Sequence, residues 1–196
     1  ERDTDIKLLK VANWLGSLGL AETVVTFMGA HALPEGSERF SYINQIIEML
    51  PDVREFSDFC DVFCEEGAFT DNESRKILEA AKEHDFSLKI HADEFGDTGG
   101  GKLAAELGVV SADHLAGSTL ETIKELQKAG VIGVLLPGTP FAILSDKFSP
   151  ARKMIANNLP IALATDCNPN CYTESMQFIQ QLAVFRMKMT PAEALV

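Results

Sequence analysis

The sequence of 196 residues predicts an α/β protein, most simply a (β/α)8 barrel present as about six strand–helix units. Short apolar strands alternate with amphipathic helices along the chain, which indicates a parallel sheet covered by helices. Polar residues gather where these strands end. In a barrel such ends converge on one catalytic mouth, whereas an open sheet spreads them along an edge. The residues concerned are His31, Glu65, His91, Glu94, His114, Thr139 and Asp166.

The individual elements follow from apolar spacing and from capping residues. A cap cluster at Thr70 to Asn72 opens one helix, and His84 at its other end is expected to be structural, since a cation suits a helix C-terminus. Strands are expected at 23–32, 60–67, 87–94, 110–117, 131–139 and 160–168. Helices are expected at 3–19, 40–56 with a break at Pro51, 70–85, 99–108, 119–130, 149–158 and 173–187.

Composition restricts the class of protein. Hydrophobic residues make up 46% and charged residues 23%, which is typical of a globular domain, and we expect a single domain over 1–196. The net charge of -12 argues against a nucleic-acid partner or an anionic membrane surface. No apolar run approaches the roughly 20 residues of a membrane span. Four cysteines favour a reducing, cytoplasmic location.

The two ends of the sequence suggest a piece of a longer protein. The chain starts at Glu1 rather than at a methionine. Near the other end, Thr190, Pro191 and Glu193 read as the cap and first turn of another helix. Six predicted strands are also two fewer than a complete barrel contains.

The stretch KIHADEF (89–95) places three ionisable side chains at the end of an apolar strand. A single histidine there is by default a hydrogen-bonded structural residue. His114 and Asp166 follow other strands at equivalent positions, however, and imidazole with carboxylate suits Zn²⁺ or Fe²⁺. Glu94 is then placed to move a proton, or else it caps the next helix or faces solvent. Asp93 points away from its neighbours in an extended chain and is interpreted as structural.

Two rival patterns carry less weight. Cys60 with Cys64, and Cys167 with Cys171, form C-x₃-C pairs that a Cys₄ zinc site permits. Their sulfurs would have to converge from distant strands, so we do not favour this site. The segment DTGGGK (97–102) lacks the spacing of a phosphate-binding loop.

Five short motifs, taken together and in order, resemble the imidazolonepropionases of the amidohydrolase superfamily. They are GAHA (29–32), HADE (91–94), ADHL (112–115), LLPGT (135–139) and ATDCNP (164–169). The resemblance implies a metal-dependent amidohydrolase barrel, with a small β-sandwich and N-terminal strands that this chain does not contain. It implies hydrolysis of the small molecule 4-imidazolone-5-propanoate to N-formimidoyl-L-glutamate in histidine degradation. It is compatible with a homodimer.

The resemblance also implies roles for individual residues. One Zn²⁺ or Fe³⁺ ion would be held by His91 and Asp166, while His114 polarises the attacked carbonyl. Glu94 would contact the substrate and shuttle protons, although Asp166 is an alternative general base. The implied substrate-binding residues are His31, Glu94, Asn168, Asn170 and Cys171.

Two departures from the family pattern keep other readings open. The family's His-x-His metal pair has no counterpart here, and Asn170 and Cys171 stand where glycine and serine or threonine are usual. One alternative is another cyclic amidohydrolase or deaminase with a different ring substrate. The other is an inactive barrel fragment that retains metal ligands.

Overall fold

The computed structural model describes residues 2–195 as an α/β fold. Six parallel strands form one sheet in chain order, and helices alternate with them, which confirms the predicted fold class. The chain divides into two compact units, residues 1–90 and 91–196. The expectation of a single domain over 1–196 stays a prediction. Among residues 2–195, no helix combines the length and apolar character that a membrane crossing requires.

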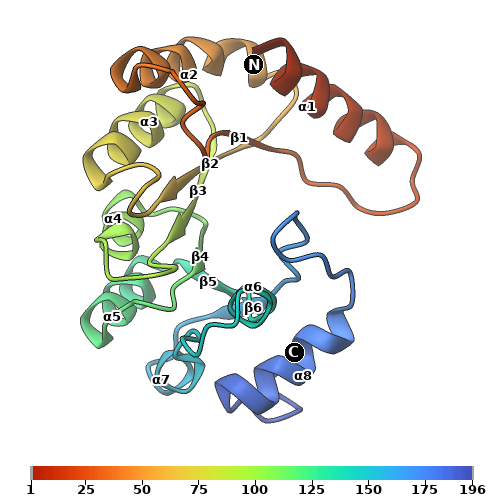
Figure 1. The fold of residues 1–196 in the computed structure, drawn as a ribbon, viewed down its shortest axis with the longest axis vertical. Coiled ribbons are helices and arrows are strands. Elements are labelled where there is room, and N and C mark those ends of the chain that lie inside the picture. Colours follow the sequence, from red (N-terminus) through yellow and green to blue (C-terminus); the bar gives the residue numbers. More distant parts are fainter. Residues whose placement is uncertain (1, 196) are drawn as a thin grey trace. The chain divides into compact units, whose positions relative to one another are not determined.

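The first unit contains three helices and the first strands. Strands β1 (Thr26–Ala30) and β2 (Phe59–Cys64) pair in parallel, and β3 (Ser87–Ala92) begins in this unit. Helices α2 (Arg39–Val53) and α3 (Asp71–Glu83) lie side by side and pack on β1 and β2 (Figure 1). Helix α1 (Arg2–Ser17) buries Leu9, whereas its Trp14 and Leu15 are exposed.

The core of this unit comes from apolar residues at the spacing that the sequence predicted. Each fully buried Leu, Ile or Phe stabilises the fold by about 1.5–3 kcal/mol relative to an exposed side chain. Thr70 and Glu73 form the reciprocal cap of α3, and His84 caps its C-terminus, as expected. The largest fully buried side chains here are Phe27, Phe69, Ile46, Leu50, Ile77, Leu78 and Ile90.

The break predicted at Pro51 is wrong. Helix α2 continues through Pro51 and ends two residues later, at Val53. Proline removes one backbone donor and disturbs the turn before it. The helix nevertheless continues through it, and the amide of Arg54 donates to the carbonyl of Leu50 at 3.0 Å.

The second unit contains the remaining strands and five helices. Strand β5 (Ile132–Leu135) lies between β4 (Ser111–His114) and β6 (Ile161–Leu163), paired in parallel with both. Helix α5 (Leu120–Ala129) packs against α4 (Gly100–Leu107) and α7 (Ala151–Ala156) (Figure 1). Helix α8 (Met176–Met187) is the last helix of the described chain.

One short helix was not predicted. The strand expected over 131–139 ends at Leu135, and the chain then forms α6 (Gly138–Ala142). Pro137 and Pro140 explain the early end of the strand, because proline cannot donate to a sheet ladder but is well tolerated in the first turn of a helix. The consequence is that Thr139 belongs to α6 rather than to a strand.

Candidate metal centre

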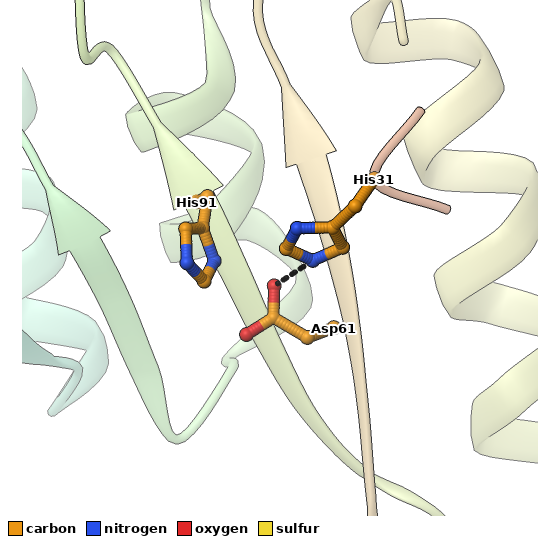
Figure 2. A group of neighbouring side chains, drawn as sticks. All are labelled: His31, Asp61 and His91. Atoms are coloured by element: carbon orange, nitrogen blue, oxygen red, sulfur yellow. Dashed lines mark hydrogen bonds and ion pairs between the residues drawn. The ribbon is translucent and has the colours of Figure 1, made fainter. Parts of the chain in front are cut away.

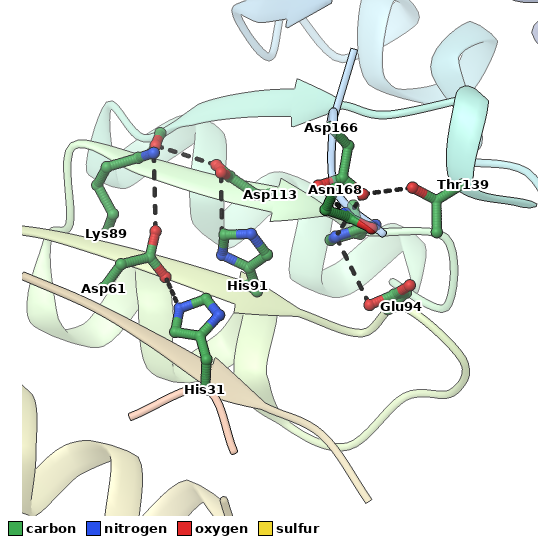
Figure 3. Close-up of polar contacts among 11 residues, drawn as sticks. His31, Asp61, Lys89, His91, Glu94, Asp113, Thr139, Asp166 and Asn168 are labelled. Atoms are coloured by element: carbon green, nitrogen blue, oxygen red, sulfur yellow. Dashed lines mark hydrogen bonds and ion pairs between the residues drawn. The ribbon is translucent and has the colours of Figure 1, made fainter. Parts of the chain in front are cut away.

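Three of the predicted residues come together in the second unit. His91 lies near the end of β3, His114 is the last residue of β4, and Asp166 follows β6 by three residues. Each offers one ligand atom, and these atoms all lie within 4.8 Å of one another. The two imidazole rings are 5.3 Å apart between centroids and tilted by 53°. Figure 3 labels His91 and Asp166.

The backbone turns sharply where these side chains are presented. Asp93, His114, Leu115 and Asp166 all have positive φ, between 52° and 73°. This left-handed region costs a residue other than glycine roughly 1–2 kcal/mol, although aspartate tolerates it better than most. Such conformations persist only where surrounding contacts fix them, and they concentrate at functional sites.

His114 faces two carboxylates. Its Nε2 atom lies 3.6 Å from Glu94 Oε2 and 4.0 Å from Asp166 Oδ2, and its side chain is 5% exposed. The backbone carbonyl of His114 accepts a hydrogen bond from Ser149 Oγ at 2.6 Å. An imidazole held in this way can pass a proton to a neighbouring group or polarise one.

A buried carboxylate also stands beside His91. Nδ1 of His91 lies 4.0 Å from Asp113 Oδ2, and Asp113 Oδ1 accepts a hydrogen bond from Ser111 Oγ at 3.1 Å. Metal-binding histidines commonly turn their second nitrogen to a carboxylate. With Nδ1 on the side of Asp113, Nε2 is the ring nitrogen available to a metal.

Both oxygens of the Asp166 carboxylate accept hydrogen bonds. Thr139 Oγ1 donates to Oδ2, and Asn168 Nδ2 donates to Oδ1 at 2.9 Å (Figure 3). The amide oxygen of Asn168 accepts in turn from the backbone N–H groups of Asn170 and Cys171, at 2.8 and 3.1 Å. Asn168 therefore orients Asp166, a contact that the sequence did not predict. The predicted contact of Asn168 with the substrate stays a prediction.

The other two residues of this loop differ in exposure. Asn170 is exposed, whereas Cys171 is buried, with its thiol 3.6 Å from the carbonyl oxygen of Thr165. Burial raises the pKa of the Cys171 thiol above its ordinary value. A buried neutral thiol is a poor ligand or nucleophile. The substrate-binding roles expected for both residues are untested.

His31 belongs to the first unit. Its Nε2 lies 3.2 Å from Oδ1 of the buried Asp61 (Figure 2). The His31 ring stacks against Phe63 with centroids 6.1 Å apart. Lys89 Nζ lies 3.7 Å from the other oxygen of Asp61. The pairing with Asp61 fixes the orientation of the His31 ring, while its predicted contact with the substrate stays a prediction.

The burial of Asp93 was not predicted from the sequence. Its side chain is fully buried, and burial raises the pKa of its carboxyl, opposed by hydrogen bonds from Ser118, Gly101 and Thr98. The sequence signal that could have drawn attention to Asp93 is its position between an alanine and the predicted catalytic Glu94. An extended chain was assumed there, whereas the positive φ of Asp93 redirects its side chain into the protein.

The cluster fits a metal ion. Two imidazoles and a carboxylate are a usual donor set for zinc and for iron. Ligand atoms around tetrahedral zinc lie about 3.3–3.5 Å apart, given bonds of roughly 2.0–2.1 Å. The three candidate ligand atoms, all within 4.8 Å of one another, are thus somewhat further apart than in a zinc-bound site. His114 is within reach of the same ion as His91 and Asp166, although the sequence interpretation gave it a different role.

Comparison with known proteins gives a consistent set of relatives. No family model matches the chain. The imidazolonepropionase of Desulfotalea psychrophila is 48% identical over 201 residues, which cover 100% of this chain and 48% of that protein. The imidazolonepropionase of Alkaliphilus metalliredigens is also 48% identical, over 97% of this chain and 47% of its own length. The chain thus spans about half the length of the curated relatives that it matches.

Solved structures agree on the fold. A guanine deaminase from C. acetobutylicum superimposes with a TM-score of 0.73 at 15% identity, covering 99% of this chain and 53% of that one. An adenosine deaminase from Xanthomonas campestris with bound zinc gives 0.66 at 18% identity, over 96% and 46%. The fold is that of the amidohydrolase barrels, present as about six βα units. The chain is therefore homologous to the imidazolonepropionases, over about half of their length.

Proposed function

We propose that this chain supplies part of the active site of an imidazolonepropionase. The reaction adds water to 4-imidazolone-5-propanoate and opens the ring to N-formimidoyl-L-glutamate. The observation that carries the proposal is 48% identity to curated imidazolonepropionases along the whole chain. The grouping of His91, His114 and Asp166 supports it independently.

We assign the metal-holding role to His91 and Asp166. When bound, Zn²⁺ or Fe³⁺ acts as a Lewis acid and lowers the pKa of water towards about 7. Thr139 donates to one oxygen of the Asp166 carboxylate and Asn168 donates to the other. These contacts keep the carboxylate in one orientation and so reduce the reorganisation needed during reaction.

The remaining groups move protons and stabilise charge. We assign acceptance of the proton of the attacking water to Glu94 or Asp166, the two carboxylates that lie within 4.0 Å of His114 Nε2. A C–O bond forms at the ring carbonyl carbon, the ring C–N bond breaks, and the proton passes to the departing nitrogen. His114 stabilises the charge that develops on the carbonyl oxygen. Removing one such donor typically lowers kcat by about 10²–10³.

The test places this chain inside a full-length relative. Residues 1–196 replace the matching segment of the Desulfotalea psychrophila imidazolonepropionase, and this protein is called the chimera below. We expect the metal-loaded chimera to consume 4-imidazolone-5-propanoate and to form N-formimidoyl-L-glutamate. The parent protein is the positive control. A folded, metal-loaded chimera with no turnover contradicts the proposal.

The alternatives predict different results in the same assay. Another cyclic amidohydrolase or deaminase would turn over hydantoin, cytosine or guanine instead. An inactive fragment would leave all four compounds unchanged while still binding metal. The cytoplasmic location and a homodimer are part of the proposal, and size-exclusion chromatography with light scattering measures the oligomeric state.

A further inference from the structure

Asp93 occupies an unusual position in the candidate metal centre. It lies two residues after His91 and directly before Glu94, yet its side chain is fully buried and does not face the cluster of proposed ligands. Burial of a carboxylate is costly unless donors surround it. Its φ of 52° adds a second cost, because this region is sparsely populated by residues other than glycine. Contacts around Asp93 must therefore offset both.

The Asp93 carboxylate joins two segments that follow different strands. Oδ2 accepts a hydrogen bond from Ser118 Oγ at 2.6 Å, in the segment after β4. Oδ1 accepts from the amide of Thr98 at 3.3 Å, and the amide of Gly101 in the first turn of α4 also donates to the carboxylate. A Cβ at Gly101 would lie 2.6 Å from Oδ2, so the close approach requires glycine there.

Backbone hydrogen bonds continue the same connection. The carbonyl of Asp93 accepts from the amide of Gly117 at 2.7 Å, and the carbonyl of Ala92 accepts from Leu115 at 3.0 Å. Ala92 and Asp93 directly follow His91, and Leu115 directly follows His114. The end of β3 and the turn after β4 are thus joined by one side-chain and two backbone hydrogen bonds.

We propose that Asp93 is a positioning residue that fixes His91 and Glu94 relative to His114. Its contacts with the proposed ligands run through the backbone, so it acts without touching the substrate. The catalytic part of this inference rests on the proposed function. The structural part, the joining of the two strand ends, does not depend on metal or substrate.

A simpler role is that Asp93 only caps α4. The N-cap residue of α4 is Gly99, which has no side-chain cap, so the Thr98 and Gly101 contacts of Asp93 satisfy donors at that end. Ser118 separates the two roles, because it contacts Asp93 from the segment after β4 and leaves the α4 contacts in place. If capping is the whole function of Asp93, Ser118→Ala should leave amide exchange at Leu115 and Gly117, and kcat, unchanged.

The first experiment measures amide hydrogen exchange in the 196-residue chain without metal. We expect Asp93→Gly and Ser118→Ala to speed exchange at Leu115 and Gly117 by about tenfold or more, since each removes a buried hydrogen bond. Glycine accepts the positive φ, so the Asp93→Gly variant isolates loss of the carboxylate. Asp97→Asn is the control, because Asp97 is an exposed acid four residues away.

The second experiment measures zinc affinity and kinetics in the chimera. We expect Ser118→Ala to lower kcat about tenfold with KM nearly unchanged, because small misplacement affects the transition state most. Asp93→Asn, which accepts the φ and keeps one acceptor oxygen, should retain more activity than Asp93→Gly. In the cobalt-substituted chimera, the d–d spectrum should shift more in Asp93→Gly than in Asp93→Asn. The spectrum of Asp97→Asn should match that of the unaltered chimera.

Specific results overturn the inference. If amide exchange at Leu115 and Gly117 is unchanged in both Asp93→Gly and Ser118→Ala, Asp93 does not join the two strand ends. Faster exchange with unchanged kcat and an unchanged cobalt spectrum would reduce Asp93 to a stabilising residue. An unaltered chimera that lacks turnover contradicts the proposed function instead, and the exchange measurement still decides whether Asp93 joins the two strand ends.

Discussion

Two regions of the second unit present the candidate metal centre in different ways. The ends of β3 and β4, which carry His91 and His114, are joined by the buried Asp93 and by backbone hydrogen bonds. The segment after β6, which carries Asp166, is more open, and its Tyr172 is 87% exposed. There the carboxylate is held by the side chains of Thr139 and Asn168.

This difference predicts different sensitivities to substitution. Backbone contacts in a buried region cannot shift without cost to folding, because the interior is close-packed. Side-chain hydrogen bonds near solvent can be lost singly, with water as a replacement partner. We therefore expect changes near β3 and β4 to affect stability, and changes after β6 to affect metal affinity more than stability.

The largest stability effect is expected for Gly117→Ala. A Cβ at Gly117 would lie 2.3 Å from the carbonyl oxygen of Gly96, and backbone cannot move aside as a flexible side chain can. We expect the free energy of unfolding to fall by about 2 kcal/mol or more, measured by urea denaturation. Gly96→Ala is the matched control, since its Cβ would meet nothing within 4 Å. Equal losses in both variants would contradict the comparison.

The next effect concerns Thr139. Thr139→Val removes the hydroxyl that donates to Asp166 and nearly preserves the side-chain shape. We expect zinc affinity of the chimera to fall about 10–100-fold, which is typical when a group orienting a metal ligand is lost. Calorimetric titration measures this, and Thr139→Ser should restore most of the affinity. A Thr139→Val variant with parental affinity would show that the hydroxyl does not orient Asp166.

A smaller effect is expected for Asn168→Ala. This change removes the 2.9 Å hydrogen bond to Asp166 Oδ1, but the bond is only partly buried and water can replace the donor. A net loss of about 1 kcal/mol corresponds to roughly fivefold weaker zinc binding. Asn170→Ala, at an exposed position, serves as the control for metal affinity. Weaker zinc binding in the Asn170→Ala variant than in the Asn168→Ala variant would contradict the assignment of Asn168 as the residue that orients Asp166.

The smallest effect is expected away from both regions, at an exposed ion pair. Arg152 lies 2.6 Å from Glu193, and this contact, with Thr190, lowers the pKa of the Glu193 carboxyl from 4.5 to about 2. A lowered folded pKa stabilises the protein above pH 4.5, and the contribution is lost as pH falls towards 2. Arg152→Ala should narrow the stability difference between pH 6 and pH 3 only slightly, because the pair is exposed. A change as large as that of Gly117→Ala would contradict this ranking.

Much of the fold could be predicted from local patterns. Apolar runs placed all six strands, and capping residues placed the start of α3, because these signals depend on neighbouring residues alone. The break at Pro51 was predicted wrongly, since a proline removes one backbone donor but packing of the buried helix residues can carry the helix through it. Helix α6 was missed because Gly138 to Ala142 form a single turn, too short for a periodic pattern.

The candidate site was predictable only in part. His91, His114 and Asp166 were found because parallel strands present their carboxyl ends together. The bond from Asn168 to Asp166 and the burial of Asp93 were not predicted. Both depend on backbone angles outside the extended region, with φ of 54° at Asp166 and 52° at Asp93, which no residue pattern in a single sequence reveals.

The measurement that tests the central assignment most directly is the metal content of two histidine variants. His91→Ala and His114→Ala are made in the chimera, and bound zinc is measured by elemental analysis alongside turnover of 4-imidazolone-5-propanoate. We predict that His91→Ala loses metal and activity together, since a ligand sets affinity, whereas His114→Ala keeps its metal and loses about 10²–10³ in kcat. Because His114 lies within ligand reach of the same ion, equal loss of zinc from both variants would contradict the division of roles.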